Sequence, residues 1–198
     1  MQVANTDTRY GAFPQALHWL TAICVIVGWL LGQFIDAFPK GPPRAWALWT
    51  HMTLGECVML FLIARLVWRI ADPPPPLEPT RFGRPLALAS KLGHYILYAL
   101  LLAVPCLGII AQLKRGNPLP IFGAWDVASP WPADRATARS LREVHGLVAN
   151  ALLIFAGVHA VAALAHHYIF RDRTLVRMLP GGRPASAAST SAIADKLK

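Results

Sequence analysis

Four long apolar runs, separated by polar and proline-rich segments, dominate the chain. The first covers roughly residues 14–35 and contains no charged residue, and the others cover roughly 46–70, 86–111 and 141–170. Each run is long enough for a helix to cross about 30 Å of hydrocarbon. Tryptophan and tyrosine occur near several run ends, where membrane-interface residues are enriched. The pattern therefore predicts an all-α fold, a transmembrane four-helix bundle.

The polar breaks divide the chain into one membrane domain and a tail. The stretch "KGPPR" ends the first run, and "DPPPPLEP" (72–79) predicts a stiff polyproline-type linker between the second and third runs. From Pro180 onward the sequence is rich in small and polar residues, which is typical of disorder. We expect one transmembrane domain over residues 1–180 and a disordered cytoplasmic tail over 181–198.

The composition decides how the net charge is interpreted. Hydrophobic residues make up 55% of the chain and charged residues 15%, whereas a soluble domain has about 25% charged residues. The formal net charge of +9 would indicate nucleic acid in a soluble protein. Here the basic residues lie between apolar runs, and more of them fall on the side of the two termini. The positive-inside rule accounts for this distribution, so we expect both termini in the cytoplasm and no nucleic-acid partner.

The third connection, roughly residues 112–140, departs from that rule. It is long and carries the stretch "LKRGNP", and the following basic residues lie in it or just after it: Lys114, Arg115, Arg135, Arg139 and Arg142. Long connections without secondary structure of their own tend to be functional. A cluster of cations on the outer face attracts anions, and contact with lipid phosphate is the alternative role.

Most of the seven histidines lie in or at the ends of the apolar runs, where an unpaired polar side chain is costly. His145 and His159 are about four helical turns apart on one face of a helix, roughly 21 Å along its axis. If successive helices alternate in direction, His51 lies in the outer half of the bundle and His18 in the inner half. His51 can therefore meet His145 near the outer face, and His18 can meet His159 near the inner face.

Two facing histidine pairs, one above the other, are what two stacked b-type haems with bis-histidine ligation require. No CxxC or CxxCH motif occurs, so a zinc finger and covalent c-type haem are not indicated. A zinc site is less consistent because no three or four ligands converge at one level. A proton relay would favour carboxylates within the runs, where Glu56 lies. Gly55, Gly146 and Gly157 lie near the histidines, and they could admit a flat macrocycle or pack helix against helix.

Six segments carry a family resemblance: "LHWLTA", "THMTLGE", "LGHYILYALLLAVPCLG", "KRGNP", "VHG" and "HAVAALAHHYIFRDRTLVRMLP". Together they resemble the bacterial cytochrome b561 family, and the resemblance covers roughly residues 9–180. That family consists of four-helix inner-membrane dihaem cytochromes. The resemblance implies a multi-pass protein of the bacterial inner membrane with two non-covalent haem b groups. It gives the role of axial ligand to the histidines already paired by helix geometry, His18, His51, His145 and His159.

The same resemblance implies a quinone site on the inner side, which here would involve His94 and His166. His166 lies one heptad after His159 and competes with it as a haem ligand. We favour His159 as the ligand because His166 lies closer to the water interface at "YIFRDR". His167 is expected to anchor the helix at the interface. Glu56 departs from an apolar family position, and its expected roles are a hydrogen bond to a haem ligand or propionate, or a neutral carboxyl.

Some members of the family are similar in role to a superoxide oxidase that reduces ubiquinone. A cationic outer connection suits a small anionic donor, and Lys114, Arg115 and Arg142 are the residues expected to steer it. The sequence thus predicts an oxidoreductase whose partners are membrane lipid, quinone and superoxide. The alternative is a cytochrome subunit that passes electrons from a periplasmic dehydrogenase or hydrogenase to quinone. A non-catalytic haem-binding scaffold or sensor is a third, less supported class.

Overall fold

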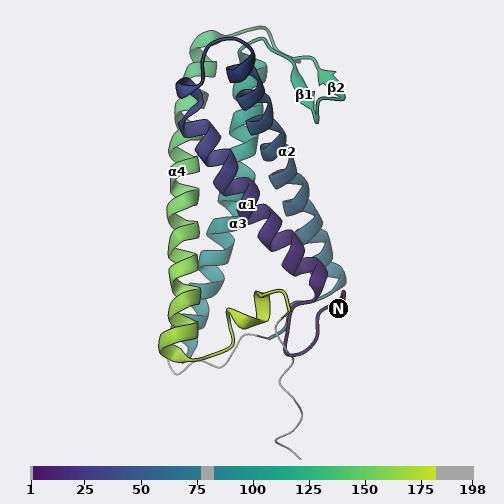
Figure 1. The fold of residues 1–198 in the computed structure, drawn as a ribbon, viewed down its shortest axis with the longest axis vertical. Coiled ribbons are helices and arrows are strands. Elements are labelled where there is room, and N and C mark those ends of the chain that lie inside the picture. The colour runs from purple at the N-terminus through teal and green to yellow at the C-terminus, as the bar shows by residue number, and fades with distance from the viewer. Residues whose placement is uncertain (1, 77–82, 182–198) are drawn as a thin grey trace, which may run out of the picture.

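Four long helices form an antiparallel bundle in the computed structural model, which describes residues 2–76 and 83–181 (Figure 1). The helices are α1 (Ala12–Gln33), α2 (Pro42–Ala71), α3 (Gly83–Lys114) and α4 (Arg135–Ala165). Shorter helical turns are η1 (Ile35–Ala37), the π-helical turn η2 (His166–Phe170) and η3 (Val176–Met178). An antiparallel hairpin of β1 (Leu119–Ile121) and β2 (Trp125–Val127) lies between α3 and α4. The predicted all-α class is confirmed, and this small hairpin was not predicted.

The start of α4 differs from the prediction. The carboxylate of Asp134 caps the helix, accepting hydrogen bonds from the Thr137 N–H at 3.0 Å and the Thr137 hydroxyl at 2.6 Å. Such a cap satisfies a donor that the first turn leaves unpaired. The helix therefore begins at Arg135 rather than near residue 141, and Arg135 and Arg139 lie on its first turns. The apolar run marked only the part of the helix suited to lipid.

Three segments of the described chain are long and apolar enough to cross a membrane: Ala12–Gln33, Gly83–Lys114 and Arg135–Phe170. The predicted span over 46–70 forms a helix, α2, but it is not among these three segments. Its place in the bundle follows instead from its packing along α1 (Figure 1).

The bundle consists of two helical pairs, α1 with α2 and α3 with α4. Packing is extensive within each pair and sparser between the pairs. A small buried core joins them in the middle of the bundle, and its residues are Val58, Leu62, Leu101 and Leu152. Leu152 lies halfway between His145 and His159 along α4. An apolar layer thus separates the levels of these two histidines.

The first and last described segments meet at one end of the bundle, here termed the terminal end; the opposite end, which carries the β hairpin, is termed the hairpin end (Figure 1). Arg9 Nη2 donates a hydrogen bond to the Leu179 carbonyl at 2.6 Å, and Trp19 Nε1 donates to the Met178 carbonyl at 2.9 Å. The segment that follows α4 is therefore bound to the start of α1. This agrees with a chain whose two ends lie on one side of a membrane.

The end of α2 joins the same face. The Asn5 N–H donates to Asp72 Oδ2 at 2.8 Å, and Arg177 Nη1 donates to the Pro76 carbonyl at 2.9 Å. The predicted polyproline linker is described only as far as Pro76. The predicted disordered tail lies outside the described residues from position 182 onward.

Candidate functional site

The histidine pair nearer the hairpin end, here called the outer pair, joins the two helical pairs. His51 of α2 and His145 of α4 face each other with ring centroids 5.9 Å apart and planes inclined by 79°. Both rings line a cavity within the bundle, together with Gly28, Gly55 and the core residue Val58. The predicted meeting of these two histidines is found in the structure.

The outer histidines are held by the backbone of neighbouring helices. His51 Nδ1 lies 2.8 Å from the Gly28 carbonyl of α1, and His145 Nδ1 lies 2.9 Å from the Val104 carbonyl of α3. A carbonyl oxygen only accepts hydrogen bonds, so each Nδ1 carries the proton and each Nε2 keeps its lone pair. Metal-binding histidines are commonly oriented by such hydrogen bonds. Both rings are therefore prepared to bind a metal through Nε2.

Two glycines make room for these hydrogen bonds. A β-carbon on Gly32 would lie 3.1 Å from His51 Cε1, and one on Gly108 would lie 3.2 Å from His145 Cε1. Each glycine follows the accepting carbonyl by one helical turn. A larger residue would displace the imidazole from its acceptor. The two helical pairs thus hold their histidines in the same manner.

The glycines singled out from the sequence have a different setting. A β-carbon on Gly55, Gly146 or Gly157 would meet no other described atom within 4 Å, so helix–helix packing does not explain them. Gly32 and Gly108 were missed by sequence reasoning. Each of them contacts a histidine on another helix, and the spacing of residues along one helix does not reveal such a contact.

The inner pair lies toward the terminal end. The rings of His18 on α1 and His159 on α4 have centroids 6.3 Å apart, as the helix geometry predicted. His94 of α3 also contacts His159, with ring centroids 5.4 Å apart. Within the described chain no group of three or more His, Cys, Asp or Glu side chains forms a metal-binding cluster. The rings of His18, His94 and His159 lie at this level without converging as a metal-binding cluster, and His159 contacts both of the others.

The spacing of both pairs fits bis-histidine ligation. A metal–imidazole bond is about 2 Å long, so two rings that bind one ion from opposite sides have centroids roughly 6 Å apart. The separations of 5.9 Å and 6.3 Å agree with this spacing. At the outer pair the available Nε2 lone pairs provide the correct donor atoms. The spacing of both pairs, and the donor atoms of the outer pair, are therefore compatible with bis-histidine binding of a metal.

His166 lies beyond the inner pair, in the π-helical turn η2. Its Nδ1 is hydrogen-bonded to Asp172 Oδ2, and its ring contacts Phe170 with centroids 5.2 Å apart. Among the hydrogen bonds and ring contacts of residues 2–76 and 83–181, none joins His166 to His94. Asp172 was missed by sequence reasoning. The signal was an acidic residue shortly after the histidine in "HHYIFRD".

The charge of Asp172 follows from its surroundings. Burial alone would raise the pKa of this carboxyl, but hydrogen bonds from His166 and Thr174 hold the pKa below its usual range. The ionised carboxylate only accepts hydrogen bonds. His166 Nδ1–H is therefore the donor in this pair, and His166 Nε2 is the free nitrogen of the ring.

The predicted steering residues lie around the connection at the hairpin end. The Lys114 ammonium lies 5.0 Å from the centroid of the Trp131 ring, a cation–π contact. The Lys114 carbonyl accepts a hydrogen bond from the Asp134 N–H at 2.8 Å, which closes the connection at its base. Arg115 and Arg142 are exposed at the same end. All three cations thus lie at the hairpin end of the bundle. The described residues show no direct contact among them.

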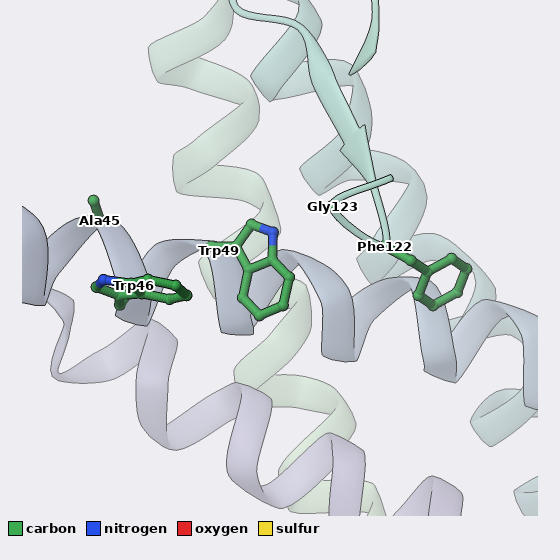
Figure 2. Close-up of a pocket in the computed structure, with 5 residues that line it drawn as sticks. All are labelled: Ala45, Trp46, Trp49, Phe122 and Gly123. Carbon is green, nitrogen blue, oxygen red and sulfur yellow. The ribbon is translucent and has the colours of Figure 1, made fainter. Parts of the chain in front are cut away.

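Glu56 anchors the β hairpin to α2. Its Oε2 accepts a hydrogen bond from the Phe122 N–H at 2.8 Å, a role that was not predicted. Phe122 and Gly123 form the hairpin turn with φ angles of 47° and 69°. A β-carbon on Gly123 would lie 3.0 Å from the Trp49 ring, so the turn approaches α2 closely (Figure 2).

The hairpin turn also borders an open pocket at the bundle surface. The pocket has a volume of about 420 Å³ and is lined by Ala45, Trp46, Trp49, Phe122 and Gly123 (Figure 2). None of these side chains titrates or commonly binds a metal. This pocket therefore offers no side chain that would bind a metal.

Comparison with known proteins identifies the family of the chain. Residues 9–181 match the family described as prokaryotic cytochrome b561. The chain is 32% identical to cytochrome b561 homolog 2 of Escherichia coli (strain K12), over 90% of this chain and 95% of that protein. It is 33% identical to cytochrome b561 homolog 1 of the same strain, over 87% and 97%. It is 30% identical to the probable superoxide oxidase CybB of Yersinia pestis, over 88% and 98%.

These matches define a membrane electron-transfer cytochrome for which haem b is the implied cofactor. The chain belongs to the prokaryotic cytochrome b561 family. The resemblance seen in the sequence is thereby confirmed, and with it a general expectation of membrane and quinone-type redox partners.

Proposed function

We propose that this protein is a dihaem cytochrome that oxidises superoxide at its hairpin end and reduces ubiquinone near its terminal end. Two superoxide anions yield two molecules of oxygen, and one ubiquinone takes up the two electrons and two protons to form ubiquinol. The observation that carries the proposal is the presence of two histidine pairs at separate levels of one bundle. Haem b bound at these pairs supplies reversible one-electron transfer.

Each histidine pair has a defined task in this proposal. His51 and His145 hold the outer haem, and His18 and His159 hold the inner one. The ring separations and the Nδ1 hydrogen bonds of the outer pair support this assignment. The core residues between the two levels keep the intervening region apolar.

The hairpin end faces the periplasm in this proposal, and both termini lie in the cytoplasm of a bacterium. The distribution of Lys and Arg supports this orientation, because the terminal half carries more of them. Lys114, Arg115 and Arg142 remain on the periplasmic side against that tendency. Their role is to attract superoxide electrostatically. The 30% identity to a probable superoxide oxidase supports this donor.

Ubiquinone is reduced on the inner side, at a site that involves His94 and His166. The contact of His94 with His159 supports this placement, because it puts a polar side chain directly beside the inner centre. The protonated ring of His166 has an Nε2–H that can donate a hydrogen bond to a quinone carbonyl oxygen.

The alternative is a cytochrome subunit that receives electrons from a periplasmic dehydrogenase or hydrogenase. The observation that favours it is Trp125 of β2, a residue that is 73% exposed at the hairpin end. Exposed aromatic residues are enriched at the centres of protein interfaces.

Stopped-flow spectroscopy of the purified, haem-loaded protein distinguishes the two functions. Superoxide should reduce the haems after rapid mixing. A ubiquinone analogue added afterwards should re-oxidise them. Reduction by a periplasmic dehydrogenase or hydrogenase, with no response to superoxide, would favour the alternative. A protein that superoxide reduces but quinone does not re-oxidise would contradict the proposed acceptor.

A further inference from the structure

His166 and Asp172 form a hydrogen-bonded pair that neither haem centre explains. Asp172 Oδ2 accepts from His166 Nδ1–H, and Asp172 Oδ1 accepts from the Thr174 N–H at 2.9 Å. The Asp172 N–H donates in turn to the His166 carbonyl at 3.1 Å. Both oxygens of the carboxylate are therefore occupied, and its position relative to the ring is fixed.

The backbone around the pair is unusual. His166 begins a π-helical turn at the end of α4, and Arg171, which follows this turn, has a left-handed φ of 56°. Single π-helical turns occur frequently at functional sites. Together these two features reverse the chain so that Asp172 returns to the ring of His166.

The pair is mostly buried but keeps some contact with solvent. The side chains of His166 and Asp172 are each 16% exposed. Because Nδ1 is bound to the carboxylate, Nε2 is the nitrogen that remains for a ligand. A carboxylate that binds Nδ1–H fixes the orientation of the ring, as a proton donor at Nε2 requires.

We propose that Asp172 is a positioning residue for quinone reduction, holding His166 so that its Nε2–H donates a proton to a quinone carbonyl oxygen. This inference rests on the proposed function. Reduction of one quinone to quinol takes two electrons, which superoxide supplies, and two protons. In each proton transfer the Nε2–H bond breaks, an O–H bond forms on the quinone, and the imidazolium becomes neutral. Water at the terminal end then reprotonates His166, so the pair acts twice for each quinol.

The competing explanation is that the pair only closes the turn after α4. The Asx-type bond from Thr174 to Asp172 would serve that purpose equally well. The two explanations differ in what happens when the carboxylate loses its charge but keeps its shape. A purely structural role predicts that this loss of charge alters folding and leaves proton transfer to the quinone unchanged. A positioning role predicts that folding is unchanged and that proton transfer to the quinone is slowed.

The test compares Asp172→Asn, Asp172→Glu and His166→Gln in the full-length, haem-loaded protein in lipid nanodiscs. His167→Ala is the matched control, because the neighbouring ring contacts Tyr168 and takes no part in the pair. The measurements are kcat and KM for a soluble ubiquinone analogue, electron transfer to ferricyanide, haem absorption, and ¹⁵N NMR of the histidine side chains. Ferricyanide accepts one electron and no proton, so it reports electron transfer alone.

Asp172→Asn and His166→Gln should each lower kcat for the quinone about ten-fold or more, as expected for loss of a general acid. KM, haem absorption and ferricyanide reduction should stay within two-fold of the wild-type values, and Asp172→Glu should restore part of kcat. The NMR signal of His166 Nδ1 should shift in Asp172→Asn, and His167→Ala should behave as wild type.

Wild-type kcat in Asp172→Asn, or an unshifted His166 signal, would overturn the inference while leaving the proposed function intact. Equal loss of quinone and ferricyanide reduction in Asp172→Asn would show a structural role and would also overturn it. A wild-type protein that reduces ferricyanide but never the quinone would instead overturn the proposed function, and this inference with it.

Discussion

Gly32 lies against the ring of His51 so closely that a β-carbon there would come within 3.1 Å of Cε1, and Gly108 stands in the same relation to His145. We predict that Gly32→Ala and Gly108→Ala each displace an outer histidine from its carbonyl acceptor. Each variant should therefore shift the absorption and lower the occupancy of the outer haem, while the inner haem keeps its spectrum. Low-temperature absorption spectra of the purified proteins measure both effects.

Gly93→Ala is the matched control for these substitutions, because a β-carbon on Gly93 would meet no described atom within 4 Å. It should leave the outer haem unchanged. Normal outer-haem spectra in both Gly32→Ala and Gly108→Ala would show that the rings do not depend on these close contacts.

The histidine pairs could be predicted from the sequence because they depend on two simple regularities. Helical periodicity puts His145 and His159 on one face, and alternating helix direction sets the depth of His18 and His51. The contact of His94 with His159 could not be predicted in this way. It depends on how α3 is rotated relative to α4, and that rotation follows from side-chain packing across the whole bundle.

The hairpin end shows a second limit of sequence reasoning. Hydropathy located the apolar part of α4 but not its polar first turns, which depend on the cap by Asp134. The β hairpin was missed because its strands are only three residues long, and its turn depends on a distant partner, Glu56. Contacts between residues far apart in the sequence leave no periodic signal in either segment.

The bond between Glu56 and the Phe122 N–H gives a prediction about the hairpin. Glu56→Ala should increase hydrogen–deuterium exchange at the Phe122 amide by up to about ten-fold, since a hydrogen bond contributes up to about 1.5 kcal/mol. Glu56→Gln keeps an accepting oxygen and should show a smaller increase. Exchange at Phe122 that is the same in all three proteins would mean that the hairpin holds its place without Glu56.

The cations at the hairpin end give a prediction about the rate at which superoxide reduces the haems. Replacing Lys114, Arg115 and Arg142 together with Gln should slow haem reduction by superoxide roughly ten-fold or more, because electrostatic steering is lost. Added salt should lower the rate in the wild type because it screens the attraction between superoxide and the cations. The Debye length is about 8 Å at physiological ionic strength and becomes shorter as salt is added. Stopped-flow traces with a neutral donor should be unchanged.

Lys91→Gln, a charge change on α3 near the terminal end, is the control for the triple variant. Superoxide should reduce the haems of Lys91→Gln as fast as those of the wild type. Superoxide rates that ignore both salt and the triple substitution would remove the steering role and favour the dehydrogenase or hydrogenase partner.

The hydrogen bonds of Asp172 predict a pH dependence of stability. Burial alone would raise its pKa, but the hydrogen bonds from His166 and Thr174 leave the pKa in the folded protein below the usual value of 3.8. A lowered folded pKa means that the carboxylate stabilises the fold above pH 3.8, and that this contribution is lost as the pH falls through the folded pKa. The difference in melting temperature between wild type and Asp172→Asn should therefore shrink below about pH 4. A constant difference from pH 6 to pH 3 would contradict this linkage.

The account as a whole depends on two haem centres built from two histidine pairs. The most direct measurement is the haem-to-protein ratio by pyridine haemochrome assay, in the wild type and in single His→Ala variants. We predict two haems per chain in the wild type and one in each of the His18, His51, His145 and His159 variants, with two retained in the His94 and His166 variants. One haem in the wild type, or loss of a haem in His166→Ala but not in His159→Ala, would contradict the account.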